Sequence, residues 1–247
     1  MNILLLDSST SNCHVTIKSD KNWVTFNTDI PYDHTEHILR IIDNSLKTIK
    51  LKIKQIDFTI IGAGPGSFTG TRISHSLIKG LFFNTEKSIL SVPSTSLFAF
   101  SFISDFKKIL ASISKIYENN KIPNLVIFSM IFGKKNRFYF SKYNLDIGLN
   151  SFLKPEIFDM PLVEILKQVK EDKLKNYFND IYLVDDPTHL QSFKDYKLEK
   201  FKSYINGIDI INFFESNLPE FQKFLITPSQ LLPLYIRKPD AEENFYK

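Results

Sequence analysis

The sequence predicts an α/β fold, and this prediction depends on two patterns in the first hundred residues. Three short apolar segments follow one another across short turns, which is typical of an antiparallel meander of strands. A strand, a helix and another strand then succeed one another, and such a connection places two parallel strands under a crossover helix. The expected strands are 3–6, 13–18, 23–28, 58–61 and 89–92, and the expected helices are 34–49 and 73–83.

The helix predicted over 34–49 has the clearest pattern. Asp33 precedes His34-Thr35-Glu36, an arrangement typical of a capping box, and apolar residues then recur at helical spacing. The second half of the chain is less regular, and 145–206 shows only weak periodicity. We expect strands at 124–130 and 137–143, helices at 94–103, 164–169 and 208–214, and a lysine-rich helix or loop over 105–120.

Length and composition indicate a soluble globular protein. The chain has 247 residues, of which 43% are hydrophobic and 23% charged, so it is long enough for two lobes, which we expect at 1–103 and 104–247. The single cysteine, Cys13, excludes an intramolecular disulfide and is typical of a reducing compartment. Apolar runs are too short for a signal peptide or a membrane span, so we expect a cytoplasmic protein. With a net charge of only +4, the many lysines do not by themselves indicate a nucleic-acid partner.

A glycine-rich turn, GAGPGSFTGTR at 62–72, lies between the strand predicted at 58–61 and the next helix. Glycines beside a proline allow a sharp turn and a close approach, and hydroxyl side chains after them can cap a helix. Either an anion binds the free amides of the helix, or protein packs against the turn. A phosphate loop would need Gly-Lys before Ser or Thr, and Ser67 occupies the third glycine position of a dinucleotide fingerprint. We therefore interpret the turn as structural, with Gly64, Pro65, Gly66, Ser67, Thr69 and Gly70 forming it.

Several motifs together resemble one family. A meander followed by α-β-α-β matches the ribonuclease H-like lobe of the actin, sugar kinase and Hsp70 superfamily. The run GPGSFTGTRI at 64–73 is highly specific, and with it the chain resembles the TsaB (YeaZ) family. The other matching segments are 3–10, 34–36, 79–81, 92–97 and 233–242.

The resemblance implies an actin-like (ASKHA) two-lobe architecture built from ribonuclease H-like lobes, with a reduced second lobe and no nucleotide site in the cleft. It also implies a non-catalytic subunit of the bacterial machinery that makes N6-threonylcarbamoyladenosine in tRNA. The implied partners are a TsaD-like catalytic subunit, a TsaE-like ATPase and, for the subunit alone, a second copy. The tRNA is the substrate of the complex, ATP is used by the partner subunits, and this subunit has no cofactor or catalytic residue of its own.

In the family, the first two helices form a helical bundle with the matching helices of the partner. Carried onto this chain, that interface includes His34, Glu36, Leu39, Asp43, Arg72, Ile73, Ser76 and Lys79. The chain departs from the family at 132–139, where Phe132 and Arg137 replace two acidic residues, and at Ser74 and His75, where small residues are usual.

Three other chemistries concern residues outside this interface or at its edge. Asp7, at the end of the first strand, could hold a metal-nucleotide, or its carboxylate could simply accept hydrogen bonds from hydroxyls and turn amides. His34 and His37 could share a metal with Asp33 or Glu36, but a polar helix start at an interface explains them better. Peptide hydrolysis lacks support, because neither Ser67 nor Cys13 has a histidine at a recognisable spacing.

A free-standing enzyme is the alternative to an interaction subunit. The chain could be a free-standing ATP-dependent enzyme of the sugar-kinase class, which would need acidic and glycine-rich nucleotide motifs from the second lobe. Phe132 stands where the obvious acidic candidate would be. We therefore favour the interaction subunit.

Overall fold

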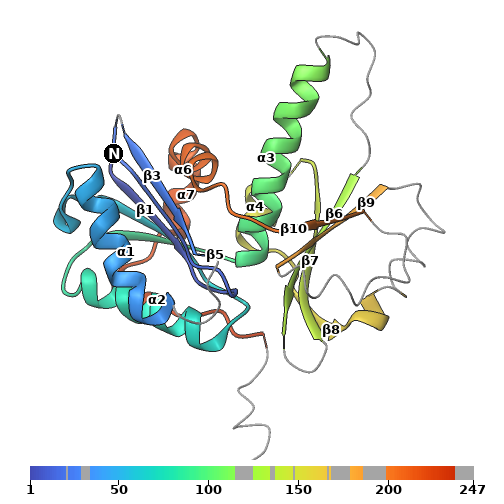
Figure 1. Ribbon diagram of the computed structural model, residues 1–247, viewed down its shortest axis with the longest axis horizontal. Coiled ribbons are helices and arrows are strands. Elements are labelled where there is room, and N and C mark those ends of the chain that lie inside the picture. Colours follow the sequence, from blue (N-terminus) through green and yellow to red (C-terminus); the bar gives the residue numbers. More distant parts are fainter. Residues whose placement is uncertain are drawn as a thin grey trace, which may run out of the picture.

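The computed structural model describes residues 1–20, 22–28, 34–114, 125–133, 137–146, 148–165, 167, 179–185 and 199–236. Two five-stranded sheets lie side by side, with a long helix, α3 (Ser94–Ser114), beside the second (Figure 1). Among the described residues no helix is long and apolar enough to cross a membrane.

The first sheet has the strand order β3-β2-β1-β4-β5. Its strands are β1 (Ile3–Asp7), β2 (His14–Lys18), β3 (Trp23–Asn27), β4 (Phe58–Gly62) and β5 (Ser88–Val92). β1, β2 and β3 pair antiparallel, whereas β4 pairs parallel with both β1 and β5. The predicted meander and the parallel crossover strands are therefore confirmed.

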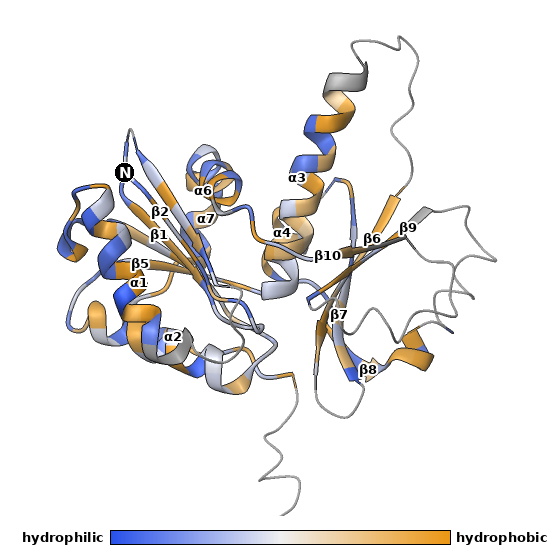
Figure 2. Ribbon diagram, viewed as in Figure 1, coloured by the Kyte–Doolittle hydropathy of each residue, from blue (hydrophilic) through white to orange (hydrophobic). Residues whose placement is uncertain are grey.

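Helices cover both faces of this sheet. Alternate side chains of β1 point to opposite faces, as the pleat requires: Leu4 and Leu6 join one apolar cluster, and Ile3 and Leu5 join the other. The first cluster packs under α1 (His34–Thr48) and α2 (Phe68–Leu81), and the second under α3 and α6 (Gly207–Ser216). Figure 2 shows the apolar sides of these helices turned to the sheet.

The second sheet repeats the topology of the first. Its order is β10-β9-β6-β7-β8, so its first three strands again form a meander and its last two again pair parallel. The strands are β6 (Leu125–Phe132), β7 (Arg137–Asn144), β8 (Phe158–Pro161), β9 (Asn179–Val184) and β10 (Glu199–Lys202). Two lobes with one topology are what the ribonuclease H-like prediction requires.

The chain crosses twice between the two sheets. α3 runs continuously past residue 103 and packs its middle against β6, while its first turns contact the first lobe's core. After β10, the helices α6 and α7 (Leu218–Phe221) return to the first sheet, and Ile226 pairs with Ile89 of β5. The remaining short elements are α4 (Leu149–Leu153) and the 3-10 turns η1 (Ile53–Gln55), η3 (Gln222–Phe224) and η4 (Pro228–Gln230). The lobe boundary at residue 103 stays a prediction.

Candidate functional site

The glycine-rich turn joins β4 to α2 and packs against the end of β1. Gly64 and Gly66 have φ values of 93° and 153°, which side chains with a Cβ rarely adopt. A Cβ at Gly66 would overlap the carbonyl oxygen of Ser9, and a Cβ at Gly70 would overlap that of Ser8. The glycines therefore allow the chain's own backbone to approach the turn.

Hydrogen bonds within the chain occupy three of the amides that the turn could offer to an anion, those of Gly64, Ser67 and Gly70. The amide of Ser67 donates to the carbonyl of Ser9 at 2.5 Å, and the amide of Gly70 donates to the Ser67 hydroxyl at 3.2 Å. The Ser8 hydroxyl donates to the carbonyl of Gly70 at 2.8 Å. Ser67 is thus the cap of α2, which begins at Phe68 and not at the predicted residue 73, and Thr69 is an exposed residue of its first turn. These contacts favour the structural interpretation of the turn.

Asp7 closes β1 and is 1% exposed. Its carboxylate accepts hydrogen bonds from the amide and hydroxyl of Ser9, at 3.0 and 2.8 Å, and from the Ser94 hydroxyl at 2.6 Å. This is the hydroxyl-and-amide arrangement that the sequence offered as the alternative to a metal-nucleotide site. Burial, and to a lesser extent the charge of Asp7, raises the pKa of the nearby Cys13 thiol to about 12, so this thiol stays protonated.

The structure describes the side chains of six of the residues of the predicted interface, and four of these are exposed. Leu39 and Asp43 of α1 are exposed, as are Arg72 and Ser76 of α2, whereas Ile73 and Lys79 are half-buried. The side chains of His34 and Glu36, and Asp33 before them, lie outside the described residues. Within the part of the chain that is described, no group of three or more histidine, cysteine, aspartate or glutamate side chains could hold a metal ion.

An aromatic cluster extends this helix surface onto the C-terminal segment. The Arg72 guanidinium lies 3.6 Å from the centre of the Phe68 ring, and its Nε donates to the Tyr235 hydroxyl at 2.8 Å. The rings of Phe68 and Tyr235 are 5.4 Å apart, and both residues are about 40% exposed. The amide of Leu234 donates to the carbonyl of Ala63 at 2.8 Å, which holds this segment on the turn.

Ser74 and His75, the two unusual residues of α2, are buried. The Ser74 hydroxyl donates to the carbonyl of Thr71 at 3.0 Å, and His75 Nδ1 lies 2.7 Å from the same carbonyl. Burial lowers the pKa of His75 to about 4, so the ring is neutral at pH 7. Both side chains face the lobe interior and leave the outer side of α2 free of them.

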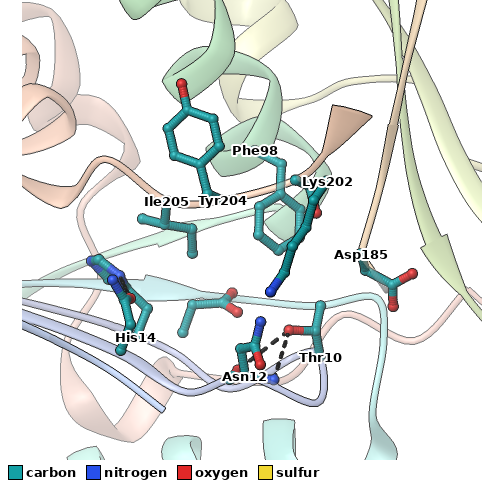
Figure 3. A pocket seen from close by; sticks show the side chains of 11 residues that line it. Thr10, Asn12, His14, Phe98, Asp185, Lys202, Tyr204 and Ile205 are labelled. Atoms are coloured by element: carbon teal, nitrogen blue, oxygen red, sulfur yellow. Dashed lines mark hydrogen bonds between the residues drawn. The ribbon is translucent and has the colours of Figure 1, made fainter. Parts of the chain in front are cut away.

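A cleft of about 300 Å³ lies between the two lobes (Figure 3). Asp7, Thr10, Asn12 and His14 line it from the first lobe, near β1 and β2. From the other side come Asp185, after β9, and the segment 202–205 that leads from β10 towards α6. His14 is buried, with Nδ1 at 2.5 Å from Asn27 Oδ1 and Nε2 at 2.8 Å from Thr16 Oγ1, and burial lowers its pKa to about 4.

Comparison with known proteins finds relatives with one shared name. The family model described as "TsaD: tRNA N6-adenosine threonylcarbamoyltransferase" matches residues 30–114. A relative from Buchnera aphidicola of the pea aphid, the tRNA threonylcarbamoyladenosine biosynthesis protein TsaB, is 27% identical over 214 residues, which cover 85% of this chain and 87% of the relative. The Escherichia coli protein of the same name is 33% identical over 92 residues, which cover 37% of this chain and 40% of that protein.

These relatives support the TsaB (YeaZ) family for this chain. A solved structure from Pseudomonas aeruginosa, described as similar to peptidase YEAZ, shares its fold with a TM-score of 0.69 at 17% identity, covering 96% of this chain and 99% of that one. A second, YeaZ from the same organism, has a TM-score of 0.66 at 15% identity, covering 95% and 99%. With two lobes of one topology, this likeness confirms the predicted actin-like α/β architecture.

The departures of this chain in the second lobe have a structural explanation. Phe132 packs edge-on against Phe138, at 5.4 Å, beside the apolar cluster of the second sheet. Arg137 donates through Nε to Asp159 of β8 at 2.8 Å, an ion pair between neighbouring strands. Phe132 and Arg137 therefore serve packing and strand pairing in this structure; residues 134–136 between them lie outside the described residues.

Sequence reasoning did not find the cleft. Asp185 follows β9 and Lys202 ends β10, and both strands lie in the segment 145–206, which shows only weak periodicity. The sequence points to Asp7, which closes β1 and lines the cleft, whereas His14 stands at a polar position of the alternating segment HVTIK and gives no signal. The residues meet only because β9 and β10 pair beside β6.

Proposed function

We propose that the chain is a non-catalytic subunit in the biosynthesis of threonylcarbamoyladenosine in tRNA, and that it binds and supports a TsaD-like catalytic subunit. A TsaE-like ATPase joins the pair, and tRNA is the substrate of the whole complex. ATP is used by the partner subunits. The observation that carries the proposal is the combination of an exposed α1–α2 surface with a glycine turn in which the amides of Ser67 and Gly70 are bonded within the chain.

The match to the TsaD family model supports the choice of partner. The matched residues, 30–114, contain α1, the glycine turn and α2, so the partner is expected to carry a corresponding pair of helices. Two related helix pairs can meet about a pseudo-two-fold axis, as two identical copies meet in an isologous dimer. For the same reason the subunit alone forms a homodimer, which the TsaD-like subunit displaces.

The outer side of α1 and α2 has the residue types of an interface. Leu39 is 54% exposed and Phe83, just after α2, is 82% exposed. Phe68, Arg72 and Tyr235 form a rigid cluster at the other end of α2. Aromatic and arginine side chains dominate the binding energy of many protein interfaces, and here they are already ordered before a partner binds.

The test is co-purification with the TsaD-like subunit of the same organism. Ser76→Arg places a long cation on the exposed side of α2, so it should reduce complex formation at least tenfold with the melting temperature nearly unchanged. The matched control is Ser216→Arg, at an exposed position of α6 on the opposite face of the sheet, which should bind as the wild type does. Equal binding by Ser76→Arg and the wild type would place the interface elsewhere.

Activity of the assembled system distinguishes a support role from catalysis by this chain. The modified nucleoside should appear in tRNA only when the subunit is present with its partners, and the subunit alone should hydrolyse no ATP. Magnesium-dependent ATP hydrolysis by the isolated chain would favour the free-standing enzyme instead.

A further inference from the structure

The excess positive charge of the chain lies in two short segments. Residues 47–57 and 79–87 together contain six lysines and two acidic residues, which gives them a net charge of +4. The whole chain has the same net charge, so its other residues carry equal numbers of basic and acidic side chains. The high lysine content is therefore balanced over the rest of the chain, and these two segments together carry the excess. Their lysines are Lys47, Lys50, Lys52, Lys54, Lys79 and Lys87.

The fold brings residues 47–57 and 79–87 together into one basic patch. The first segment runs from the end of α1 to the start of β4, and the second runs from the end of α2 to the start of β5. β4 and β5 pair parallel with Phe58 opposite Ser88, so the residues before these two strands lie side by side. Lys87 Nζ donates to the carbonyl of Lys54 at 3.3 Å, which is a direct contact between the segments. The basic patch therefore lies at the carboxyl ends of α1 and α2.

Four lysines of the basic patch carry charge that no described residue neutralises. Lys47 and Lys79 lie in the last turns of α1 and α2, where the helix dipole favours a cation, and Lys47 also pairs with Asp43 at 2.6 Å. The other four lie outside these helices and form no ion pair with any described residue: Lys50, Lys52, Lys54 and Lys87. The first three of these are exposed to solvent. Like charges at close range repel one another, and a bound polyanion replaces this repulsion with attraction.

The basic patch is suited to a phosphate backbone. An ammonium group binds phosphate as a point charge without a fixed geometry, so separate lysines suit a chain of phosphates. Membrane binding would also need apolar side chains exposed among the lysines. In 47–57 the lysines alternate with Ile49, Leu51 and Ile53, which instead pack on the apolar cluster beneath α1 and α2. Phe83 of the second segment is exposed, but it belongs to the α1–α2 surface proposed for the partner subunit. These observations favour a nucleic acid over a lipid surface.

We propose that the basic patch contacts the sugar-phosphate backbone of the tRNA substrate. This role rests on the proposed function, because the patch adjoins the α1–α2 surface that binds the TsaD-like subunit. A tRNA held by that subunit can therefore extend across the joint surface of the two proteins. Contacts to phosphates supply affinity and orientation, and they do not read the base sequence.

The experiment measures the affinity for fluorescently labelled tRNA by anisotropy, for the full chain alone and for its complex with the TsaD-like subunit. Neutralising two exposed lysines, by Lys52→Gln together with Lys54→Gln, should weaken tRNA binding at least about tenfold at about 100 mM salt. The slope of log affinity against log salt concentration should fall in magnitude by about 1.5 to 2, because roughly one counterion is released per phosphate contact. Complex formation and the melting temperature should not change, because both positions are exposed and lie beyond α1 and α2.

Lys154→Gln together with Lys223→Gln is the matched control. Both lysines are exposed, and their Nζ atoms lie 5.5 and 5.1 Å from the centre of the Phe224 ring. Phe224 packs on the apolar cluster beneath α3 and α6, on the opposite face of the first sheet. The control variant loses the same amount of charge but should bind tRNA as the wild type does.

The basic patch and the proposed function fail in different ways. Absence of a complex between the wild-type subunits would contradict the proposed function, whereas the chain alone still tests the patch at about 50 mM salt, where charge contacts are strong. The patch proposal is overturned if the wild type does not bind tRNA, if the patch variant binds it equally well, or if the control variant loses as much affinity. Patch-dependent binding to phosphatidylglycerol vesicles, with tRNA binding unchanged in the patch variant, would overturn it in favour of a membrane surface.

Discussion

The glycine turn and the inter-lobe cleft both border the end of β1, yet only the cleft has room for another molecule. At the turn, the carbonyl groups of Ser8 and Ser9 occupy the space that Gly66 and Gly70 leave open. In the cleft, side chains from strands far apart in the sequence surround about 300 Å³. Glycines in a strand-to-helix turn therefore indicate a close approach, and the approaching group is here the chain's own backbone.

Asp7 belongs to both regions and shows how they differ. On the turn side its carboxylate accepts hydrogen bonds from Ser9 and Ser94, and Gly62 is required because a Cβ there would overlap it. On the other side it lines the cleft. The same carboxylate thus fixes the first lobe's architecture and contributes charge to the cleft.

The largest expected effect is at the turn. Gly66→Val should lower the free energy of unfolding by about 3 kcal/mol, because Cβ would overlap backbone that cannot move as a side chain does. Chemical denaturation measures this loss, and binding of the TsaD-like subunit should fall with it. If the variant is as stable as the wild type, a side chain at position 66 fits beside the backbone of Ser9, and the close approach is wrong.

Gly80→Ala is the control within the same helix. A Cβ at Gly80 meets no atom within 4 Å, and the residue is exposed near the end of α2. This substitution should raise stability by about 0.5–1 kcal/mol, because alanine restricts the unfolded chain. The free energy of unfolding should therefore fall on substitution of Gly66 and rise on substitution of Gly80. This difference separates the effect of a close backbone approach from the effect of helix propensity.

A smaller effect is expected at the bond between the turn and the start of α3. Ser94→Ala removes the donor to Asp7 and the acceptor of the Gly64 amide, both buried, so it should cost about 2 kcal/mol. Ser19→Ala, which removes a hydrogen bond at an exposed turn, should change stability by less than about 0.5 kcal/mol. Equal losses in these two variants would contradict the role given to Asp7.

A different kind of effect is a pH dependence of stability to which His14, in the cleft, and His75, in α2, both contribute. His14 and His75 have pKa values near 4 in the folded protein against 6.5 as the ordinary value. The unfolded chain therefore binds protons first as the pH falls, so this stability is complete above pH 6.5 and is lost towards pH 4. Between pH 7 and pH 5 each histidine should contribute a loss of roughly 1 to 2 kcal/mol.

Replacing each histidine by glutamine separates the contributions of His14 and His75 to the pH dependence of stability. Unfolding free energies at the two pH values should differ less in His14→Gln than in the wild type, and less again in the double variant with His75→Gln. If the wild type loses no stability between pH 7 and pH 5, neither histidine has the lowered pKa in the folded protein.

The first lobe was largely predictable from the sequence, because its strands are short apolar runs between turns. The start of α2 was not, since Thr69 and Gly70 are weak helix formers and the Ser67 cap alone marks the boundary. In the second lobe, β10 carries the polar sequence EKFK, which has no clear alternation. The cleft could not be predicted, because strand pairing, and not sequence spacing, brings His14, Asp185 and Lys202 together.

The most direct test of the structural role of the glycine turn follows the amide chemical shifts of Ser67 and Gly70. Isotope-labelled protein is titrated with magnesium and ATP. We predict no saturable change at these two amides, because Ser9 and the Ser67 hydroxyl already accept their hydrogen bonds. Changes confined to cleft residues would leave the structural role of the turn intact. A saturable, magnesium-dependent shift of Ser67 and Gly70 would contradict it, because it would place a phosphate on the turn.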